Sequence, residues 1–532
     1  MDLILYNANI YTMDDNCNLV EAIAIKNGLV SQIGTNEDIL KLASLNTVTI
    51  NMKGQTIVPG FNDSHLHLYM TGKLLSWINL LNTKSLKEVI DKVLKEVNSK
   101  DLQVYMGHGW NQDYFTDSTG FITKDDLDKV SNSKPIILYR ACGHIAVVNS
   151  KALELFKVTN NINLNDGKVD YNTGIFYENA LDIITNNLPT PSVDEIKSIL
   201  KKAIKHANKF GLTSVQSDDF FTTSSGYNPI IKAYLELEKE KELNLRVYEQ
   251  SLLTNISSLD NFIKDGYFTG WGNNLFKIGP LKLIGDGSLG ARTAAMRNEY
   301  KDDAKNFGIL NYDDNTLYEL IKTAHLNNLQ IAIHAIGDKA MDQALKLYEK
   351  VLNEYPKDDH RHGVVHCQVM DLNQINKFKD LNLVAYVQPI FVHYDQRIVE
   401  ERVGKLLSET SYAFKTMIDK EINLAIGTDS PIEELNPINN IYCAVTRKTL
   451  DGATNGWNTK ENLSVYEAVK HYTVYSSYAS FEENIKGKLI PNYLADLTIL
   501  DKNIFECDPE EIKNIKVNMT IIGGNIVFNR FL

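Results

Sequence analysis

Short apolar runs separated by turn-forming residues characterise both ends of the chain. They include Leu3–Tyr6 and Ala22–Ile25 near the start and Val517–Ile522 near the end, with Asn, Asp and Gly between the runs. Apolar runs of about four to eight residues bounded by turn formers are typical of β-strands. The pattern therefore predicts that residues 1–57 and 485–532 are rich in β-strand.

The middle of the chain has a different pattern, in which short apolar runs alternate with amphipathic segments. Helical periodicity is clear over Thr316–Ala324 and Lys339–Tyr348. Strands that alternate with helices predict a parallel α/β sheet or barrel, and eight such units predict a (β/α)8 TIM barrel. The predicted strands are Thr56–Phe61, Leu212–Gln216, Leu245–Gln250, Leu281–Ile284, Gln330–His334, Gly363–His366, Val384–Gln388 and Asn423–Gly427.

The interval between the first two of these strands is too long for one helical crossover. It runs from Phe61 to Leu212, whereas connections in compact domains are usually far shorter. We predict an inserted α+β subdomain over residues 76–195, so that the barrel comprises residues 58–75 and 196–484. The insertion has its own predicted strands, Gln103–Met106 and Pro135–Tyr139, and a predicted helix, Ser85–Val97.

Composition narrows the class of protein. The net charge is −12 and no basic stripe is present, so nucleic acid and anionic membranes are not expected partners. No apolar run approaches the roughly 20 residues of a membrane span, and the first residues do not resemble a signal peptide. The five scattered cysteines form no Cys-x-x-Cys pair, which is typical of a reducing compartment. We expect a cytoplasmic protein that acts on a small molecule, and a homo-oligomer is compatible with this composition.

Candidate chemistry begins after the first predicted barrel strand, in Val58-Pro-Gly-Phe-Asn-Asp-Ser-His-Leu-His67. Residues i and i+2 of a strand point the same way, so His65 and His67 can hold one metal ion. A short motif alone is a weak signal, and the chain contains a second pair, His360 and His362. We interpret that second pair as part of a charged, solvated loop, whereas His65 and His67 follow a buried-type strand.

Four later strands end in residues that suit a metal site: Lys282 on the fourth, His334 on the fifth, His366 on the sixth and Asp429 on the eighth. Catalytic groups of TIM barrels lie at these strand ends. Imidazoles and a carboxylate are ligands that zinc accepts. Taken singly, the histidines could be core residues, the lysine an ion-pair residue and the aspartate a turn or cap residue. Their convergence favours a divalent-metal site.

This order of residues resembles the metal-dependent amidohydrolase superfamily. The surrounding motifs narrow the resemblance to amidohydrolase family 3, the YtcJ-like or N-substituted formamide deformylase-like proteins. The motifs span nearly the whole chain. They are the His65/His67 run, Gly107-His-Gly-Trp110, Gly143-His-Ile-Ala-Val-Val-Asn-Ser150, Lys282-Leu-Ile-Gly-Asp-Gly-Ser-Leu-Gly-Ala-Arg-Thr-Ala294, His334-Ala-Ile-Gly-Asp338, His366-Cys-Gln368, Gly427-Thr-Asp-Ser-Pro431 and Ala495-Asp-Leu-Thr-Ile-Leu-Asp501.

The resemblance implies a barrel with a composite β-sandwich formed by residues 1–57 and 485–532. It also implies two zinc ions bridged by a carboxylated Lys282, one held by His65, His67 and Asp429 and the other by His334 and His366. A metal-activated hydroxide would cleave an amide-type C–N bond (N-acyl, N-formyl or cyclic amide). Asp429 would act as general base and then as general acid.

Several alternatives stay open. An unmodified Lys282 would leave a mononuclear N-acyl hydrolase with one ion. Many ring deaminases of the superfamily carry a glutamate where this chain has Gly337, so a deaminase is less favoured. A non-catalytic scaffold would lack ligands that are all present here. Residues that could contact the substrate, although structural roles explain them about as well, are Trp110, His144, Asp286 and Arg292.

Overall fold

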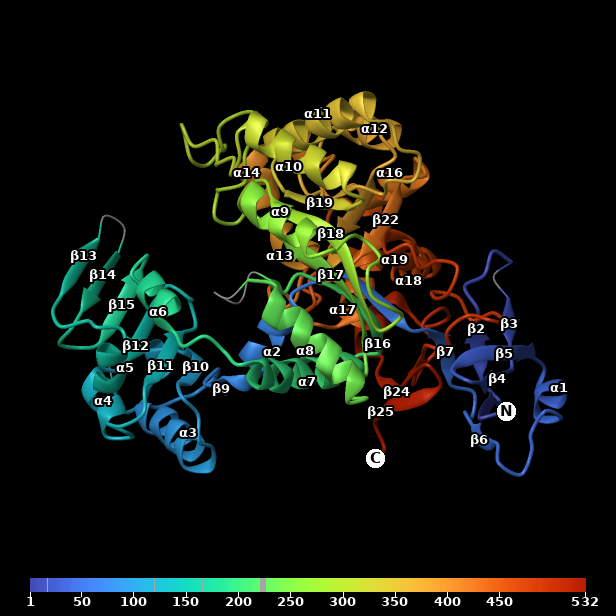
Figure 1. The fold of residues 1–532 in the computed structure, drawn as a ribbon, viewed down its shortest axis with the longest axis horizontal. Coiled ribbons are helices and arrows are strands. Elements are labelled where there is room, and N and C mark those ends of the chain that lie inside the picture. Colours follow the sequence, from blue (N-terminus) through green and yellow to red (C-terminus); the bar gives the residue numbers. More distant parts are fainter. Residues whose placement is uncertain (17, 119, 165–166, 221–225) are drawn as a thin grey trace. The chain divides into compact units, whose positions relative to one another are not determined.

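The computed structural model describes residues 1–16, 18–118, 120–164, 167–220 and 226–532. The chain divides into two compact units (Figure 1). The first unit contains residues 1–68, 203–221 and 230–532, and the second contains residues 69–202 with a short segment that ends at Pro229. Within the described ranges, no helix combines the length and apolar character that a membrane crossing requires.

An eight-stranded parallel sheet forms the centre of the first unit. Neighbours in the sheet are also neighbours in chain order, and every pair is parallel. This arrangement confirms the predicted α/β barrel. The strands are β8 (Phe61–Leu66), β16 (Leu212–Ser217), β17 (Arg246–Leu252), β18 (Phe276–Ile284), β19 (Ile331–Ala335), β20 (Gly363–His366), β21 (Val384–Val387) and β22 (Asn423–Ile426).

Backbone hydrogen bonds just beyond β22 bring the two end strands of this sheet together. The N–H of Asp429 donates to the carbonyl of His65 at 2.8 Å, and the N–H of His67 donates to the carbonyl of Ser430 at 2.8 Å. The barrel is thus nearly closed where the first and last strands carry predicted ligands. Closure places Asp429 beside the two histidines, although the two segments lie at opposite ends of the barrel sequence.

Amphipathic helices follow most of the barrel strands (Figure 1). In α11 the residues Ala340, Ala344, Leu347 and Val351 are buried at helical spacing. The helix α10 begins after Asp313, whose carboxylate accepts the N–H groups of the first turn. The helices of this unit include α8 (Asn228–Lys239), α9 (Ile256–Lys264), α10 (Asp314–Leu326), α11 (Asp338–Glu354), α12 (Leu372–Asp380), α16 (Phe414–Asp419), α17 (Pro437–Thr446), α18 (Val465–His471) and α19 (Val474–Ala479).

The first predicted barrel strand was placed too early. The structure divides this stretch between β7 (Thr56–Pro59), which pairs with β2 and β23, and β8, which enters the barrel at Phe61. The chain changes sheets at Gly60, where a Cβ atom would lie 2.1 Å from Thr213 Oγ1. Only glycine fits this close approach, which the sequence pattern presented as a turn.

Strands from both ends of the chain form two further sheets. One has the order β5-β4-β1-β6, and the other has the order β25-β24-β23-β7-β2-β3. A common core includes Leu5, Ile25, Ile57, Leu497 and Ile521, so the two β-rich ends fold together. The more specific prediction of a composite β-sandwich stays a prediction. The strands are β1 (Leu3–Tyr6), β2 (Asn9–Tyr11), β3 (Leu19–Val20), β4 (Ala22–Lys26), β5 (Leu29–Gly34), β6 (Val48–Asn51), β23 (Leu497–Leu500), β24 (Val517–Ile522) and β25 (Asn525–Asn529).

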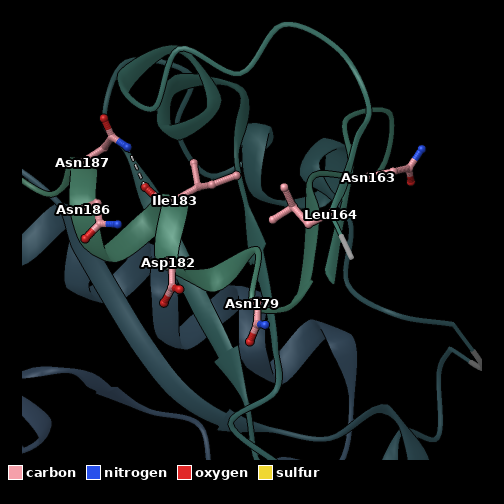
Figure 2. A pocket seen from close by; sticks show the side chains of 7 residues that line it. All are labelled: Asn163, Leu164, Asn179, Asp182, Ile183, Asn186 and Asn187. Atoms are coloured by element: carbon pink, nitrogen blue, oxygen red, sulfur yellow. Dashed lines mark hydrogen bonds between the residues drawn. The ribbon is translucent and has the colours of Figure 1, made fainter. Parts of the chain in front are cut away.

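The second unit contains a mixed seven-stranded sheet of order β13-β14-β15-β12-β11-β10-β9. The helix α3 (Leu86–Ser99) packs Val89 and Val93 into its core. An open polar pocket on this unit is lined by four asparagines, Asp182, Leu164 and Ile183 (Figure 2). The strands are β9 (Ile78–Asn79), β10 (Tyr105–Trp110), β11 (Ile136–Arg140), β12 (Ile145–Val148), β13 (Ile162–Leu164), β14 (Gly167–Asp170) and β15 (Ile175–Glu178).

Candidate metal centre

Every predicted metal ligand lies at or just beyond the C-terminal end of a barrel strand. His65 is in β8, Lys282 in β18, His334 in β19 and His366 at the end of β20, and Asp429 follows β22. His65, Lys282, His366 and Asp429 are buried, whereas His67 and His334 are partly exposed. Buried polar groups at strand ends of a barrel mark the region where barrel enzymes bind substrate.

Three of these residues form a compact group. Possible ligand atoms of His65, His366 and Asp429 all lie within 4.8 Å of one another. The Oδ1 atom of Asp429 lies 3.3 Å from His65 Nε2 and 3.2 Å from His67 Nε2. The ring of His334 lies next to that of His366, with 4.4 Å between their centroids. The structure therefore brings all four predicted histidines and Asp429 into one cluster.

Hydrogen bonds at the far side of each ring determine which nitrogen of three of these histidines carries a proton. The Nδ1 atom of His65 lies 2.6 Å from Gln250 Oε1, and that of His366 lies 2.8 Å from Gln388 Oε1. The Nδ1 atom of His67 lies 3.0 Å from the carbonyl oxygen of Asp218. Because each partner is an acceptor, each Nδ1 must carry the proton. The Nε2 atoms then present lone pairs toward the cluster, as metal-binding histidines do.

These lone pairs converge on an oxygen that also lacks a donor. Among the described residues, Asp429 Oδ1 is buried without a hydrogen-bond partner. Lone pairs facing one another repel unless a cation lies between them. A proton can serve as that cation: burial lowers the pKa of His67, but the negative charges of Asp429 and Asp218 beside it raise it to about 9. A divalent ion fits the same set of donors.

The remaining charges fit the same interpretation. Burial opposes ionisation of Asp429, but the adjacent rings of His65 and His67 outweigh it and hold the pKa of this carboxyl well below its usual range. Burial lowers the pKa of His366 well below that of a free imidazole. Asp429 and His366 thus have the protonation states that metal binding requires, whereas His67 has to release its proton when an ion binds.

His334 and Lys282 differ from the other predicted ligands. His334 Nε2 lies 3.1 Å from the carbonyl oxygen of Gly287 and therefore carries its proton there, which leaves Nδ1 as the lone pair. The Nζ atom of Lys282 lies 3.8 Å from Asp218 Oδ2, and burial lowers the pKa of this lysine. His334 could thus act as a ligand only through Nδ1, and Lys282 only after losing its positive charge.

Comparison with known proteins identifies the family. The model described as the amidohydrolase family matches residues 48–528. The chain belongs to the amidohydrolase family.

Similar proteins match this amidohydrolase along nearly its full length. The YtcJ protein of Bacillus subtilis (strain 168) is 32% identical, over 100% of both chains. N-substituted formamide deformylase from Arthrobacter pascens is 21% identical, over 99% of this chain and 98% of the relative. A crystal structure of an uncharacterized metal-dependent hydrolase from Pyrococcus horikoshii OT3 is 30% identical, with a TM-score of 0.81 over 95% of this chain and 99% of that one. With the cluster of histidines and Asp429, these matches support a hydrolase that uses a divalent metal.

Three residues of the amidohydrolase centre escaped the sequence analysis. Gln250 and Gln388 orient His65 and His366, as described above. Asp63 is fully buried and accepts hydrogen bonds from Thr428 N, Thr428 Oγ1 and Tyr472 Oη at 2.8–3.1 Å, so it joins β8 to the segment after β22. The available signal for Gln250 and Gln388 was their position as the last residues of two predicted barrel strands.

The predicted substrate-contacting residues are engaged with other protein groups. Trp110 is buried in the core of the second unit and donates its Nε1–H to the carbonyl of Leu138 at 3.0 Å. His144, in the same unit, lies 2.8 Å from Glu178 Oε2. In the barrel unit, Arg292 pairs with Asp302 at 2.8 Å and Asp286 binds backbone N–H groups. Substrate contact by Trp110, His144, Asp286 and Arg292 stays a prediction.

The interpretation of His360 and His362 as part of a solvated loop was wrong. Both histidines and Arg361 are buried. The guanidinium of Arg361 forms two hydrogen bonds with Glu483, at 2.8 and 2.9 Å, and lies over the ring of Tyr478 at 3.9 Å. These partners lie more than a hundred positions away in the sequence, so the local charge pattern could not reveal them.

Proposed function

We propose that this amidohydrolase cleaves the C–N bond of an amide-type small molecule (an N-acyl, N-formyl or cyclic amide) at a two-zinc site. The observation that carries the proposal is the convergence of imidazole lone pairs on the buried Oδ1 of Asp429. A divalent cation satisfies all of these donors at once, whereas a proton satisfies only one pair of them. The name of the formamide deformylase relative is consistent with an amide substrate.

In the proposed centre, His65, His67 and Asp429 would hold one ion, and His334 and His366 would hold the other. A carboxylated Lys282 would contribute to both. Burial favours the neutral amine of Lys282, and only a neutral amine can add carbon dioxide to form a carbamate. When bound, the ions supply Lewis-acid chemistry: they polarise a carbonyl and lower the pKa of water from 15.7 to about 7.

Asp429 is the proposed proton carrier. It is a carboxylate at neutral pH, because its imidazole neighbours hold its pKa well below the usual range. Its Oδ1 atom is buried and accepts no hydrogen bond from the described residues, so it is available to take a proton from the attacking water. The same oxygen then delivers the proton to the departing amine, as general acid.

The position of Gly337 disfavours the ring-deaminase alternative. A Cβ atom at this residue would lie 2.0 Å from the carbonyl oxygen of Ala295, a backbone atom that cannot move aside. The loop after β18 therefore occupies the space that a glutamate proton donor would need. The absence of this group favours hydrolysis in which Asp429 carries the proton.

The test is a screen of zinc-loaded enzyme against N-formyl, N-acyl and cyclic amides. We expect amine release from one of these classes and its loss in the H65A/H67A variant, which should also lose zinc. H206A, which removes an imidazole from α7 (Val193–Lys209), is the control and should keep wild-type activity and zinc content. Full activity and metal content in H65A/H67A would refute the proposal.

A further inference from the structure

The loop after β18 is anchored to the turn after β19 by one buried carboxylate. Asp286 is 1% exposed. Its Oδ1 accepts the N–H of Ile336 at 3.0 Å, and its Oδ2 accepts those of Gly337 at 2.8 Å and Ala295 at 2.9 Å. The same carboxylate therefore fixes both the loop and the turn that directly follows the strand of His334.

Asp286 also lies directly against that histidine. Its Oδ1 is 3.3 Å from His334 Nε2. The proton on this nitrogen points to the carbonyl of the next residue, Gly287, at 3.1 Å. The acceptor of the His334 proton thus belongs to the residue adjacent to the anchor, and its position depends on the hydrogen bonds of Asp286.

The packing around this anchor leaves little freedom. The turn approaches the loop so closely that a Cβ atom on Gly337 would lie 2.0 Å from Ala295 O. Within the loop itself, a Cβ atom on Gly308 would lie 1.9 Å from Ala294 O. The loop backbone is therefore packed tightly on itself and against the turn, and the ring of His334 has a fixed partner on its Nε2 side.

We propose that Asp286 is a positioning residue for His334 and not a substrate contact. It holds the Gly287 carbonyl on the Nε2 side, so that Nδ1 keeps its lone pair and faces the centre. The negative charge of Asp286 beside the Nε2–H also makes Nδ1 more basic and so a stronger metal ligand, which is the usual effect of a carboxylate partner on a metal-binding histidine. The inference rests on the proposed two-ion site, in which His334 and His366 hold the second ion.

Asp338 of α11 provides a matched control that binds the same loop. It is 2% exposed, and its Oδ1 accepts the N–H of Arg297 at 2.8 Å. It therefore links the same loop to the same turn, from the first residue of α11. Asp338 binds the loop through Arg297 and has no part in the Asp286–His334 contact. Its substitution therefore tests the effect of loosening the loop without disturbing the proposed metal ligand His334.

The experiment measures zinc affinity by competition with a chromophoric chelator in the wild type, D286N and D338N. We expect the second ion to bind about 10- to 100-fold more weakly in D286N, while the first ion is unaffected. D338N should bind both ions as the wild type does. Wild-type affinity for both ions in D286N, or an equal loss in D338N, would overturn the inference.

Two further measurements separate positioning from general damage. The H334N variant should already bind the second ion weakly, so the double variant H334N/D286N should have the same affinity as H334N. If the losses of affinity are additive, Asp286 does not act through His334. Should D286N fail to fold, the ¹⁵N chemical shifts of the wild-type His334 ring, assigned with H334N, report the tautomer directly. Protonation at Nε2 is expected, and protonation at Nδ1 would overturn the inference. If the wild type itself binds no zinc, the proposed function is refuted, and this outcome is distinct from a failure of the role of Asp286.

Discussion

Two single residues, Gln250 and Gln388, orient the rings of His65 and His366. The amide of Gln250 accepts the proton of His65 Nδ1 and donates to the carbonyl of Ser64 at 3.0 Å, so its own orientation is fixed. Gln388 accepts the corresponding proton of His366. Each glutamine thus selects one tautomer of its histidine, in which the Nε2 lone pair faces the candidate metal centre.

Replacing Gln250 by methionine should weaken the binding of the ion that His65 is proposed to hold. Methionine has a similar volume but no acceptor for the Nδ1 proton, so the ring loses its fixed tautomer. We expect zinc affinity at that ion to fall about 10- to 100-fold, measured by chelator competition. The matched variant Q388M should instead weaken the binding of the ion that His366 is proposed to hold. Wild-type affinity for both ions in Q250M would show that the amide does not orient the ring.

At the scale of elements, three histidines support the starts of β19 and β20. The N–H of Ile331 donates to His362 Nδ1 at 3.1 Å, and His362 Nε2 lies 2.9 Å from His325 Nδ1. His360 Nδ1 accepts the N–H of His362 at 2.9 Å. All of these hydrogen bonds can form when the three imidazole rings are neutral. Burial lowers the pKa of His360 to about 4 and that of His362 well below its usual range.

These histidines should make stability fall in acid. Their folded-state pKa lies below the unfolded value of about 6.5, so the unfolded chain binds more protons below that pH. The stabilisation is present above pH 6.5 and is lost as the pH falls toward 4, with a slope of up to about 1.4 kcal/mol per pH unit for each proton. In H360N an amide oxygen can still accept the N–H of His362, but nothing titrates there. Denaturant unfolding between pH 7.5 and 4.5 should give a shallower slope in H360N, and an unchanged slope would contradict this account.

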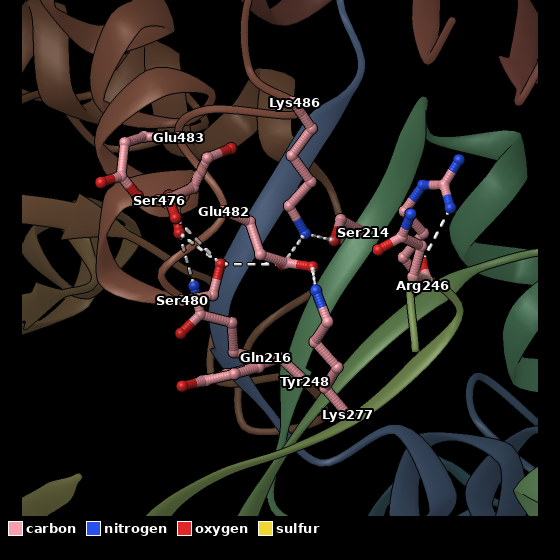
Figure 3. A network of polar contacts seen from close by, with 12 residues as sticks. Ser214, Gln216, Arg246, Tyr248, Lys277, Ser476, Ser480, Glu482, Glu483 and Lys486 are labelled. Atoms are coloured by element: carbon pink, nitrogen blue, oxygen red, sulfur yellow. Dashed lines mark hydrogen bonds and ion pairs between the residues drawn. The ribbon is translucent and has the colours of Figure 1, made fainter. Parts of the chain in front are cut away.

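At the scale of the whole molecule, a buried ion cluster joins the barrel to the segment after α19 (Figure 3). Glu482 pairs with Lys486 and, at 2.8 Å, with Lys277 of β18. Lys486 donates to Ser214 Oγ of β16 at 2.6 Å. Burial raises the pKa of Glu482, but the charges of Lys486 and Lys277 outweigh it and lower the pKa to about 2. One carboxylate thus neutralises two lysines, one of them fully buried.

Removing that carboxylate should destabilise the barrel unit as a whole. In E482Q both lysines lose their partner, and breaking a buried ion pair costs about 3–5 kcal/mol. Urea unfolding should show this loss, whereas E421Q, at an exposed pair with Lys379, should show no measurable change. Equal stability of E482Q and the wild type would mean that the cluster contributes nothing to folding.

The barrel strands and the strand-end positions of the clustered residues could be predicted from the sequence because both depend on local pattern. The strand Gly363–His366 has the predicted bounds, and its last residue is a member of the cluster. The contacts that complete the site are not local. Asp63 and Thr428 are 365 positions apart, and His65 and Gln250 are 185 apart. Such pairs depend on how the barrel closes and on the register of its strands, which periodicity does not determine.

The cluster around Asp429 is proposed to hold two divalent ions, and the metal content of the wild-type protein tests this directly. The protein is stripped with a chelator, reloaded with zinc, freed of excess metal and analysed by mass spectrometry against protein concentration. We expect two zinc ions per chain. One ion per chain, or none, would contradict a two-ion centre.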